Sequence, residues 1–390
     1  MFSVIIPSYN SAIFLEEAIR SVLAQTYKDY EIIVVDDGSS DDCYGVVQRF
    51  GNRVKYIWQE NQGLAGARNT GIRASNQQFL ALLDADDQWL PNFLETMVEL
   101  INEQDDAAVY YACAQCMDSD GRDLPRTLGG PAVPPDKFYH RLLRANFLIP
   151  STIVIRRAVA VNAGLFDQTL RSCEDWDLWL RILPEKKFVG TSRCLTRYRL
   201  HGNSLSDNLD GMHQSAKAVI IKNFGEDDKN TQTWTADKKQ AYGGLYRYQA
   251  LTLVQRRNDW QTSASYLNQA LLADPSTAMD LDFFYDLVYG SYPIGYRGSK
   301  QNFGLGKNQV QLMEMLQEVF DNFDQPDSKL IKDQTFGTAY FAAGLHAYNI
   351  GEYSLTRQWL INAWRYRPDL WRDSRVSLNY LKSFIKTILE

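Results

Sequence analysis

The chain has 390 residues, enough for two or three domains at roughly 150 residues each. Its 45% hydrophobic and 23% charged residues are typical of a chain that builds large cores in water. The 41 basic and 47 acidic residues leave a net charge of −6, which argues against a general nucleic-acid binder because affinity for phosphate backbones depends mostly on Lys and Arg.

The N-terminal sequence and the cysteines indicate the cellular compartment of the protein. Pro7, Ser8 and Asn10 interrupt the apolar N-terminus too early for a signal peptide, and no apolar run approaches the ~20 residues of a bilayer-spanning helix. We therefore expect a cytoplasmic protein, with peripheral contact at the inner face of the membrane left open. Five cysteines, an odd and sparse set, favour a reduced setting over a disulfide framework: Cys43, Cys113, Cys116, Cys173 and Cys194. Because the CxxC of Cys113 and Cys116 has no second Cys/His pair at zinc-site spacing, we interpret it as part of a buried strand.

The first ~115 residues alternate apolar strand-like runs with helical spacing. The predicted strands cover residues 3–6, 31–35, 54–58 and 79–83. Such alternation with short links predicts a parallel sheet flanked by helices, in which ligands bind beyond the carboxyl ends of the strands. The polar loops Pro7–Asn10, Asp36–Asp41 and Asp84–Asp87 all follow strands. We expect them to converge on one crevice.

The middle of the chain is less regular. Residues 118–136 are rich in Gly, Pro and Asp, which is typical of a surface hairpin or a long loop. A further strand is predicted over residues 152–155, and an apolar helix begins near Cys173 and continues to Leu183.

After about residue 210 helical spacing dominates to the end of the chain. Two segments, 246–275 and 339–368, each contain a helix, a polar turn, a second helix and a proline. The second resembles a tetratricopeptide unit in Tyr340, Gly344, Leu360, Ala363 and Pro368. Two unrelated helical hairpins are the alternative, and both interpretations stay open. We expect one domain over residues 1–210 and an all-helical one over 211–390.

Three carboxylates follow the predicted strand at residues 79–83. Asp84, Asp86 and Asp87 lie within four positions, where adjacent charges repel. A divalent cation would resolve the repulsion, since Mg²⁺ and similar ions take oxygen ligands, few of them from protein and the rest from water or phosphate. A solvated acidic turn before the next helix is the alternative.

At this point the chain resembles the family 2 glycosyltransferases, nucleotide-sugar enzymes of GT-A fold. The resemblance rests on ordered motifs between residues 3 and 206: VIIPSYN, EIIVVDDGSSD, ENQGLAGARNTG, LALLDADD, GLFD, EDWDLWLR and YRLHGNS. Each motif alone is weak, and their order is the specific signal. The implied fold is an α/β GT-A domain, followed here by the helical half.

The resemblance also implies a nucleotide-sugar site. Pro7 and Tyr9 would line the base pocket, Asp37 would accept a hydrogen bond from the base, and Arg68 would lie near the ribose and diphosphate. A carboxylate there suits the N3–H donor of uracil, which favours a UDP-sugar. The implied site comprises Pro7, Tyr9, Asn10, Asp36, Asp37, Gly66, Arg68, Asp84 and Ala85.

Metal and catalytic roles are implied in the same way. Asp86 would bind Mn²⁺ or Mg²⁺ directly, with Asp84 and His201 at the same site, while Asp87 would support the loop and the following helix start. Asp175 matches the family's catalytic base, and Glu174 its acidic neighbour. First-turn charge that complements the helix dipole is the alternative for this pair, and both interpretations can hold.

The predicted function is transfer of a sugar from a UDP-sugar to a hydroxyl acceptor with inversion, the acceptor being a polysaccharide or glycolipid intermediate. We expect residues 131–151 and the helical half to serve the acceptor, a membrane surface or a protein partner. The alternatives are a non-catalytic sugar-nucleotide-binding adaptor, against which the intact acids speak, and a nucleotidyltransferase. The latter would need a Gly-rich basic loop where this chain has PSYNSAIFLEE.

Overall fold

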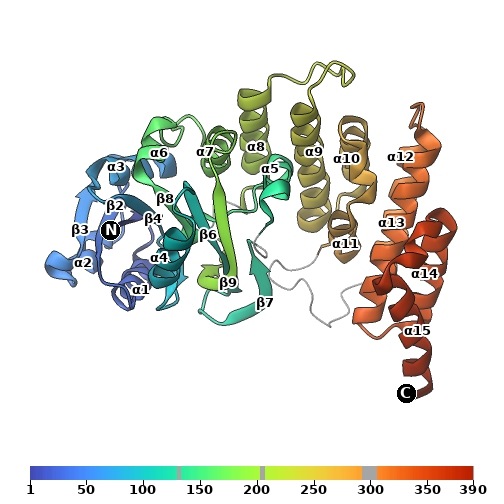
Figure 1. The fold of residues 1–390 in the computed structure, drawn as a ribbon, viewed down its shortest axis with the longest axis horizontal. Coiled ribbons are helices and arrows are strands. Elements are labelled where there is room, and N and C mark those ends of the chain that lie inside the picture. The colour runs from blue at the N-terminus through green and yellow to red at the C-terminus, as the bar shows by residue number, and fades with distance from the viewer. Residues whose placement is uncertain (130–132, 203–206, 292–304, 390) are drawn as a thin grey trace. The chain divides into compact units, whose positions relative to one another are not determined.

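The computed structural model describes residues 1–129, 133–202, 207–291 and 305–389 (Figure 1). It divides into two compact units, Met1–Glu226 and Asp227–Glu390. The first unit is built on a mixed sheet with the strand order β3-β2-β1-β4-β8-β6-β9-β5, and β7 pairs with β6. The predicted α/β fold is confirmed.

The parallel part of the sheet carries the polar loops. Strand β1 pairs in parallel with β2 and β4, and β2 with β3, so their carboxyl ends lie at one edge. Strand β8 then runs antiparallel to β4 and β6, whereas β9 runs parallel to β6. The bounds are β1 Phe2–Ser8, β2 Tyr30–Asp36, β3 Lys55–Trp58, β4 Phe79–Leu82, β5 Gln88–Trp89, β6 Val109–Met117, β7 Asp123–Leu128, β8 Ile153–Arg156 and β9 Phe188–Arg199.

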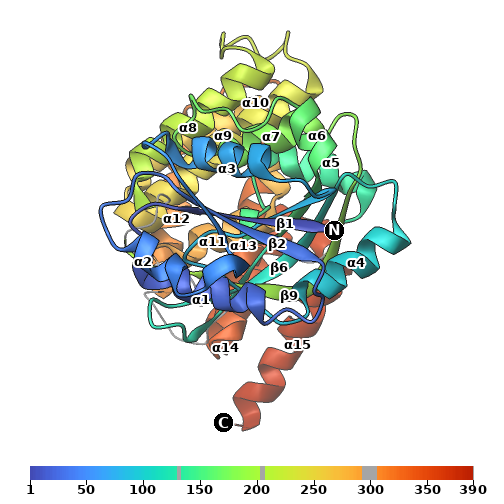
Figure 2. The same cartoon turned by 90° about the vertical axis from the view of Figure 1, so that its left-hand side faces the viewer.

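Helices cover both faces of the parallel strands (Figure 2). In β2, Ile32 and Val34 join the core beneath α1, α2 and α4, whereas Ile33 and Val35 pack with Ala67 of α3 on the opposite face. Side chains alternate between faces along a strand, so an all-apolar strand is the pattern that burial on both sides requires. The helices of this unit are α1 Ala12–Leu23, α2 Cys43–Gln48, α3 Gly63–Ala74, α4 Phe93–Glu103, α5 Pro135–Arg144, α6 Arg157–Asn162, α7 Glu174–Ile182 and α8 Leu209–Phe224.

Helix α3 lies unusually close to the sheet. A Cβ atom added at Gly71 would come within 2.5 Å of Ile5 Cγ2, so only glycine permits this approach. The approach holds α3 against β1 and fixes the residues one turn earlier in the helix, among them Arg68.

The predicted hairpin forms where β6 and β7 pair antiparallel, while residues 130–132, and with them Pro131 of the expected acceptor segment, lie outside the described residues. The expectation of reduced cysteines is wrong at one pair. Cys113 of β6 and Cys194 of β9 are joined as a disulfide, because the parallel register brings their Cα atoms to 4.1 Å. Cys116, the other half of the CxxC, is a free, buried strand residue.

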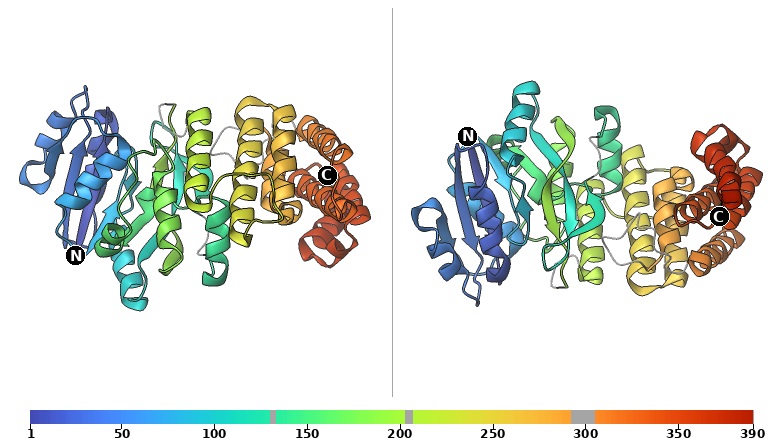
Figure 3. Two further views of the ribbon diagram at one scale, coloured as in Figure 1. Left: turned by 90° about the horizontal axis from the view of Figure 1, so that it is seen from above. Right: turned by 90° about the horizontal axis from the view of Figure 1, so that it is seen from below.

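The second unit is helical, and both predicted hairpins are present. Helix α9 packs on α10, side by side in the yellow part of Figure 3, and α13 packs on α14. The turn at Asn258 has a φ of 54°, a left-handed conformation that Asn tolerates well. The helices are α9 Ala236–Arg257, α10 Trp260–Ala273, α11 Leu281–Tyr289, α12 Leu305–Asp321, α13 Ser328–Asn349, α14 Tyr353–Tyr366 and α15 Ser374–Leu389.

The boundary between the units falls after α8, whereas the composition suggests residue 210, in the first turn of α8. The reason is a buried charge in the first unit. Asp177 of α7 accepts hydrogen bonds from Lys222 Nζ at 3.0 Å and from Asn223 Nδ2 at 3.1 Å, both on α8. Among the described residues, no helix is both long and apolar enough to cross a membrane.

Candidate active site

Arg68 of α3 joins two of the predicted acidic segments. Its Nη2 donates to Asp84 Oδ1 at 2.6 Å, and its Nη1 donates to Glu174 Oε1. The guanidinium is 1% exposed and lies 5.4 Å from the centre of the Phe166 ring. Arg68 is expected near the ribose and diphosphate, but in the structure its charge is shared between two carboxylates. We refer to Asp84, Arg68 and Glu174 as the acid bridge.

Burial governs the protonation of the acid bridge. Burial raises the pKa of Glu174 to about 7, although the positive charge of Arg68 opposes the rise. Burial raises the pKa of Asp84 as well, again against the influence of Arg68. Loss of hydration therefore raises the pKa of these two carboxylates more than the single shared guanidinium lowers it.

Asp175 differs from its neighbour Glu174 in its partner. Its Oδ2 accepts a hydrogen bond from Asn146 Nδ2 at 2.7 Å, which leaves it outside the direct contacts of Arg68. Burial raises the pKa of Asp175, with the charge of Arg68 opposing. Both acids open α7, after Cys173 with a φ of 59°. The first turn of α7 therefore carries two acids with different partners: Arg68 binds Glu174, and the amide of Asn146 binds Asp175.

Asp86 and His201 meet on the other side of the same acidic loop. His201 Nε2 lies 2.8 Å from Asp86 Oδ2, and their side chains are 14% and 31% exposed. The His201 ring packs on Phe14 of α1, with 5.1 Å between ring centres. The predicted metal residues Asp86 and His201 are therefore brought together.

These two residues suit a divalent cation. A carboxylate oxygen and an imidazole nitrogen lie within hydrogen-bond distance of each other, and both side chains are partly exposed. Mg²⁺ and Mn²⁺ take few protein carboxylates and complete their shells with waters and phosphates. Within the described part of the chain, no group of three or more His, Cys, Asp or Glu side chains converges on one point. Asp84, predicted at the metal site, is instead bound to Arg68 and receives Ser151 Oγ at its backbone N–H.

Asp87 points away from Asp86 and into the core. Its Oδ1 accepts a hydrogen bond from the backbone N–H of Arg199 at 2.9 Å, which ties the acidic loop to β9. It does support the loop, but a two-residue strand, β5, follows it and α4 begins only at Phe93. Burial raises the pKa of Asp87, and the neighbouring Asp86 charge adds to the rise.

The predicted nucleotide residues surround the ends of β1 and β2. Asp37 Oδ1 accepts hydrogen bonds from Gln59 Nε2 at 2.6 Å and from the N–H of Gln62 at 2.9 Å. Asp36 Oδ2 accepts from Tyr56 Oη at 2.6 Å. Both carboxylates are thus fixed by neighbouring residues that the motifs did not single out.

The other predicted nucleotide residues differ in exposure. Asn10 Oδ1 accepts from the N–H of Ser40 at 2.8 Å, and Tyr9 leaves 53% of its surface exposed beside this turn. Pro7, Gly66 and Ala85 are buried around the same loops. An exposed aromatic ring next to buried carboxylates is an arrangement that can receive a base.

Two further residues escaped the sequence analysis. Asn146 lies in the segment expected to serve the acceptor, but nothing in its local sequence links it to Asp175, 29 residues away. Arg199 lies within the YRLHGNS motif, and its partners come from distant parts of the chain. Only the spatial arrangement reveals either residue.

A cavity of about 410 Å³ lies elsewhere in this unit, lined in part by Asn69, Arg73 and Phe166. Its remaining cations are engaged, since Lys222 binds Asp167 and Arg181 binds Asp177. The acidic loops do not line this cavity, so the chemistry described above is not located there.

A family model described as glycosyl transferase family 2 matches residues 3–166. The chain is 31% identical over 214 residues to the putative teichuronic acid biosynthesis glycosyltransferase TuaG of Bacillus subtilis, which covers 53% of this chain and 82% of TuaG. It is 32% identical over 213 residues to the Escherichia coli UDP-Glc:alpha-D-GlcNAc-diphosphoundecaprenol beta-1,3-glucosyltransferase WfgD, covering 53% of this chain and 80% of WfgD.

Other relatives match over a smaller share of their own length. With the uncharacterized glycosyltransferase RP339 of Rickettsia prowazekii the identity is 32% over 210 residues, which is 64% of that protein and 52% of this chain. Among solved structures, S. aureus TarS 1–349 in complex with UDP is similar in fold, with a TM-score of 0.50 and 17% identity over 82% of this chain and 89% of that one. The identity to TuaG and WfgD over most of their length settles the classification: the chain belongs to glycosyl transferase family 2.

Proposed function

We propose that this glycosyltransferase moves a sugar from a UDP-sugar to a hydroxyl group of a saccharide or lipid-linked acceptor, with inversion at the anomeric carbon. The acid bridge carries the proposal. One buried guanidinium binds both the acidic loop that contains Asp86 and the helix start that contains Asp175, so a leaving-group site and a base lie around the same residue. Inverting transfer needs these two functions and no covalent intermediate.

The donor would bind at the ends of β1 and β2. Asp36 and Asp37 are held in place by Tyr56 and Gln59, and Tyr9 presents an open ring beside them. The name of WfgD includes UDP-Glc, and TarS has been solved with UDP, which supports a uridine nucleotide here as well.

Asp86 and His201 would hold Mn²⁺ or Mg²⁺, and Asp84 would stay with Arg68 at the edge of the site. When bound, such an ion neutralises the charge that develops on the departing diphosphate. The chain's own contribution is the converging pair, Asp86 Oδ2 and His201 Nε2, set 2.8 Å apart before any ion arrives.

Asp175 would act as the base. Its carboxylate takes the proton of the acceptor hydroxyl as that oxygen bonds to the anomeric carbon and the bond to the UDP oxygen breaks. Asn146 orients one oxygen of Asp175 and leaves the other for the hydroxyl, while Glu174 is engaged by Arg68. General-base assistance of this kind typically contributes ~10²–10⁴-fold.

The names of two relatives support the proposed acceptor class. TuaG is named for teichuronic acid biosynthesis and WfgD for a diphosphoundecaprenol-linked sugar. A polysaccharide or lipid-linked intermediate at a membrane surface would suit this chain, with the helical unit as a site for the acceptor, the membrane or a protein partner.

A panel of nucleotide sugars tests the donor, with thermal shift and hydrolysis measured in the presence and absence of Mn²⁺. We expect a UDP-sugar to give the largest Mn²⁺-dependent shift, and NMR of the product to show the inverted anomer. Asp86→Asn should abolish transfer and remove the Mn²⁺ dependence of UDP affinity, because a charged oxygen ligand is lost.

Asp120→Asn, at an exposed acid of the neighbouring hairpin, is the matched control and should bind UDP with the wild-type Mn²⁺ dependence. Unchanged Mn²⁺-dependent UDP binding in the Asp86 variant would exclude the proposed metal site, and a retained anomer would exclude inversion.

A further inference from the structure

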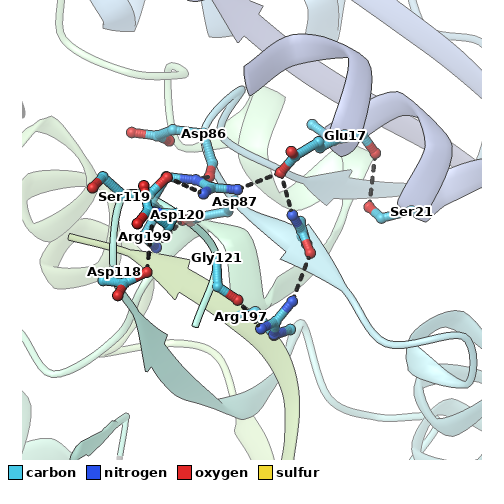
Figure 4. Close-up of polar contacts among 12 residues, drawn as sticks. Glu17, Ser21, Asp86, Asp87, Asp118, Ser119, Asp120, Gly121, Arg197 and Arg199 are labelled. Atoms are coloured by element: carbon cyan, nitrogen blue, oxygen red, sulfur yellow. Dashed lines mark hydrogen bonds and ion pairs between the residues drawn. The ribbon is translucent and has the colours of Figure 1, made fainter. Parts of the chain in front are cut away.

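Arg199, at the end of β9, is a buried arginine whose three nitrogens bind three separate parts of the unit (Figure 4). Its Nε donates to the backbone carbonyl of Asp86 at 2.8 Å. Its Nη1 donates to the carbonyl of Ser119, in the β6–β7 turn, at 2.9 Å. Its Nη2 donates to Glu17 Oε2, on α1, at 2.6 Å. One side chain therefore joins the acidic loop, the hairpin and α1.

Two further contacts extend this link to both candidate metal residues. The backbone N–H of Arg199 donates to Asp87 Oδ1, so the loop is held on both sides of the Asp86–Asp87 peptide. The guanidinium also lies 4.6 Å from the centre of the Phe14 ring, and Phe14 packs in turn on His201. Arg199 therefore contacts Asp86 directly, at its backbone carbonyl, and contacts His201 indirectly, through the ring of Phe14.

We propose that Arg199 is a positioning residue that sets the separation of Asp86 and His201 for the divalent cation, an inference that rests on the proposed metal site. Residues 84–87 lie between strands β4 and β5, outside regular structure, so side-chain contacts decide where Asp86 points. A guanidinium suits this task because its planar fork donates in fixed, diverging directions. The single ammonium of a lysine cannot reach three such acceptors.

The ion pair with Glu17 does not by itself account for the arrangement. Glu17 is half exposed, and ion pairs open to water typically contribute little to folding. The buried side of Arg199 instead serves backbone carbonyls, one of them that of Asp86. Groups that orient a metal ligand typically change metal affinity 10–100-fold when they are mutated.

Arg197 provides a matched control on the same strand. It lies two residues earlier, so its side chain leaves the same face of β9. Its hydrogen bonds go to Gln88 at 3.0 Å, to Asp123 at 2.9 Å and to the carbonyl of Gly121 in the β6–β7 turn, none of which belongs to the acidic loop. Arg197 is 26% and Arg199 2% exposed, so Arg197→Gln reports the effect of removing an arginine that holds the same hairpin but not the acidic loop.

The experiment is a Mn²⁺ titration of the full chain with UDP present, followed by electron paramagnetic resonance of free Mn²⁺. We expect Arg199→Lys and Arg199→Gln to weaken Mn²⁺ binding about 10–100-fold, and Arg197→Gln to leave it within about twofold of the wild type. UDP affinity measured without Mn²⁺ should stay near that of the wild type in both Arg199 variants, because Arg199 is proposed to act on the cation site alone.

The outcomes separate the two proposals. If the wild type shows no Mn²⁺-dependent UDP binding, the proposed metal site is wrong, and this inference with it. If the wild type binds Mn²⁺ and Arg199→Lys binds it equally well, only the inference is overturned. An equal loss in Arg197→Gln, or a matching loss of UDP affinity without Mn²⁺ in the Arg199 variants, would show a general structural effect and overturns it too. Arg199→Lys keeps the positive charge beside Glu17, so it still tests the inference if Arg199→Gln fails to fold.

Discussion

At the scale of single residues, neighbouring acids have different roles because their partners differ. Glu174 and Asp175 are adjacent at the start of α7, yet one is bound by Arg68 and the other by Asn146. The Arg68 guanidinium holds the Glu174 carboxylate in an ion pair, whereas the neutral amide of Asn146 orients the Asp175 carboxylate without neutralising it. This contrast supports Asp175 as the base.

The first prediction tests that contrast. Asp175→Asn keeps the shape of the side chain and removes its basicity, so kcat should fall about 10²–10⁴-fold while the affinity for the UDP-sugar stays near that of the wild type. Glu174→Gln should reduce kcat less, since Arg68 keeps Asp84 as a partner. Steady-state kinetics with a fixed acceptor measures both; the opposite ranking would move the base to Glu174, and two fully active variants would remove it from this helix.

The second prediction concerns pH and stability. The pKa of Glu174 is raised by burial from 4.5 to about 7, so between these values the folded state binds more protons than the unfolded state. The contribution of Glu174 to the free energy of unfolding is therefore full below pH 4.5 and is lost as the pH rises through 7.

Denaturant titrations from pH 5 to 8 measure this loss. We expect the free energy of unfolding of the wild type to change more negatively with pH than that of Glu174→Gln, by at most about 1.4 kcal/mol per pH unit. Parallel curves for the two proteins would show that Glu174 titrates in the folded protein as it does in the unfolded chain.

At the scale of elements, close helix packing depends on particular glycines. In the second unit, Gly344 of α13 faces Leu360 of α14, and an added Cβ would lie 2.6 Å from Leu360 Cδ2. Leu360 is fully buried and has little room to move. Gly306 lies in α12, and an added Cβ there would meet no atom of the described residues within 4 Å.

The third prediction compares these two glycines. Gly344→Ala should lower the free energy of unfolding by about 1–3 kcal/mol through overpacking. Gly306→Ala should raise it slightly, by up to about 1 kcal/mol, because alanine favours a helix. Thermal and urea unfolding of the two variants provide the comparison; equal effects would mean that the α13–α14 contact is looser than described.

Elements whose evidence is local could be predicted from the sequence. The all-apolar strand at residues 31–35 and the acidic loop at residues 84–87 are marked by their own residues, and Asp86 and His201 were assigned together through their motifs. Arg199 binds Asp86 across 113 positions, and Asn146 binds Asp175 across 29, so neither contact leaves a local pattern. The Cys113–Cys194 pair likewise depends on a strand register that composition does not reveal. The helix expected directly after Asp87 was wrong because β5 pairs there with β9.

At the scale of the whole molecule, the chain consists of two units whose boundary follows α8. The motifs implied to bind the nucleotide sugar precede this boundary. Helix α8 belongs with them because Lys222 and Asn223 serve the buried carboxylate of Asp177.

The fourth prediction follows from that carboxylate. A chain of residues 1–226 should fold and bind UDP but lose use of the natural acceptor, since the helical unit is absent. A chain of residues 1–210 removes two partners of Asp177 and should lose a further 1–3 kcal/mol or so in the free energy of unfolding. Urea unfolding and UDP titration of both chains test this; equal stability would place the boundary at residue 210, and full acceptor use by residues 1–226 would exclude an acceptor role for the helical unit.

The acid bridge also limits how this protein can change over generations. Asp84 and Glu174 share one arginine, so a lineage that loses Arg68 first is left with two buried acids and no counter-ion. If either acid is lost first, Arg68 keeps only one of its two carboxylate partners, and a buried charge that is not fully paired destabilises the fold. Each single step thus passes through a less stable ancestor. We expect descent to alter these positions jointly, or to leave all of them as they are.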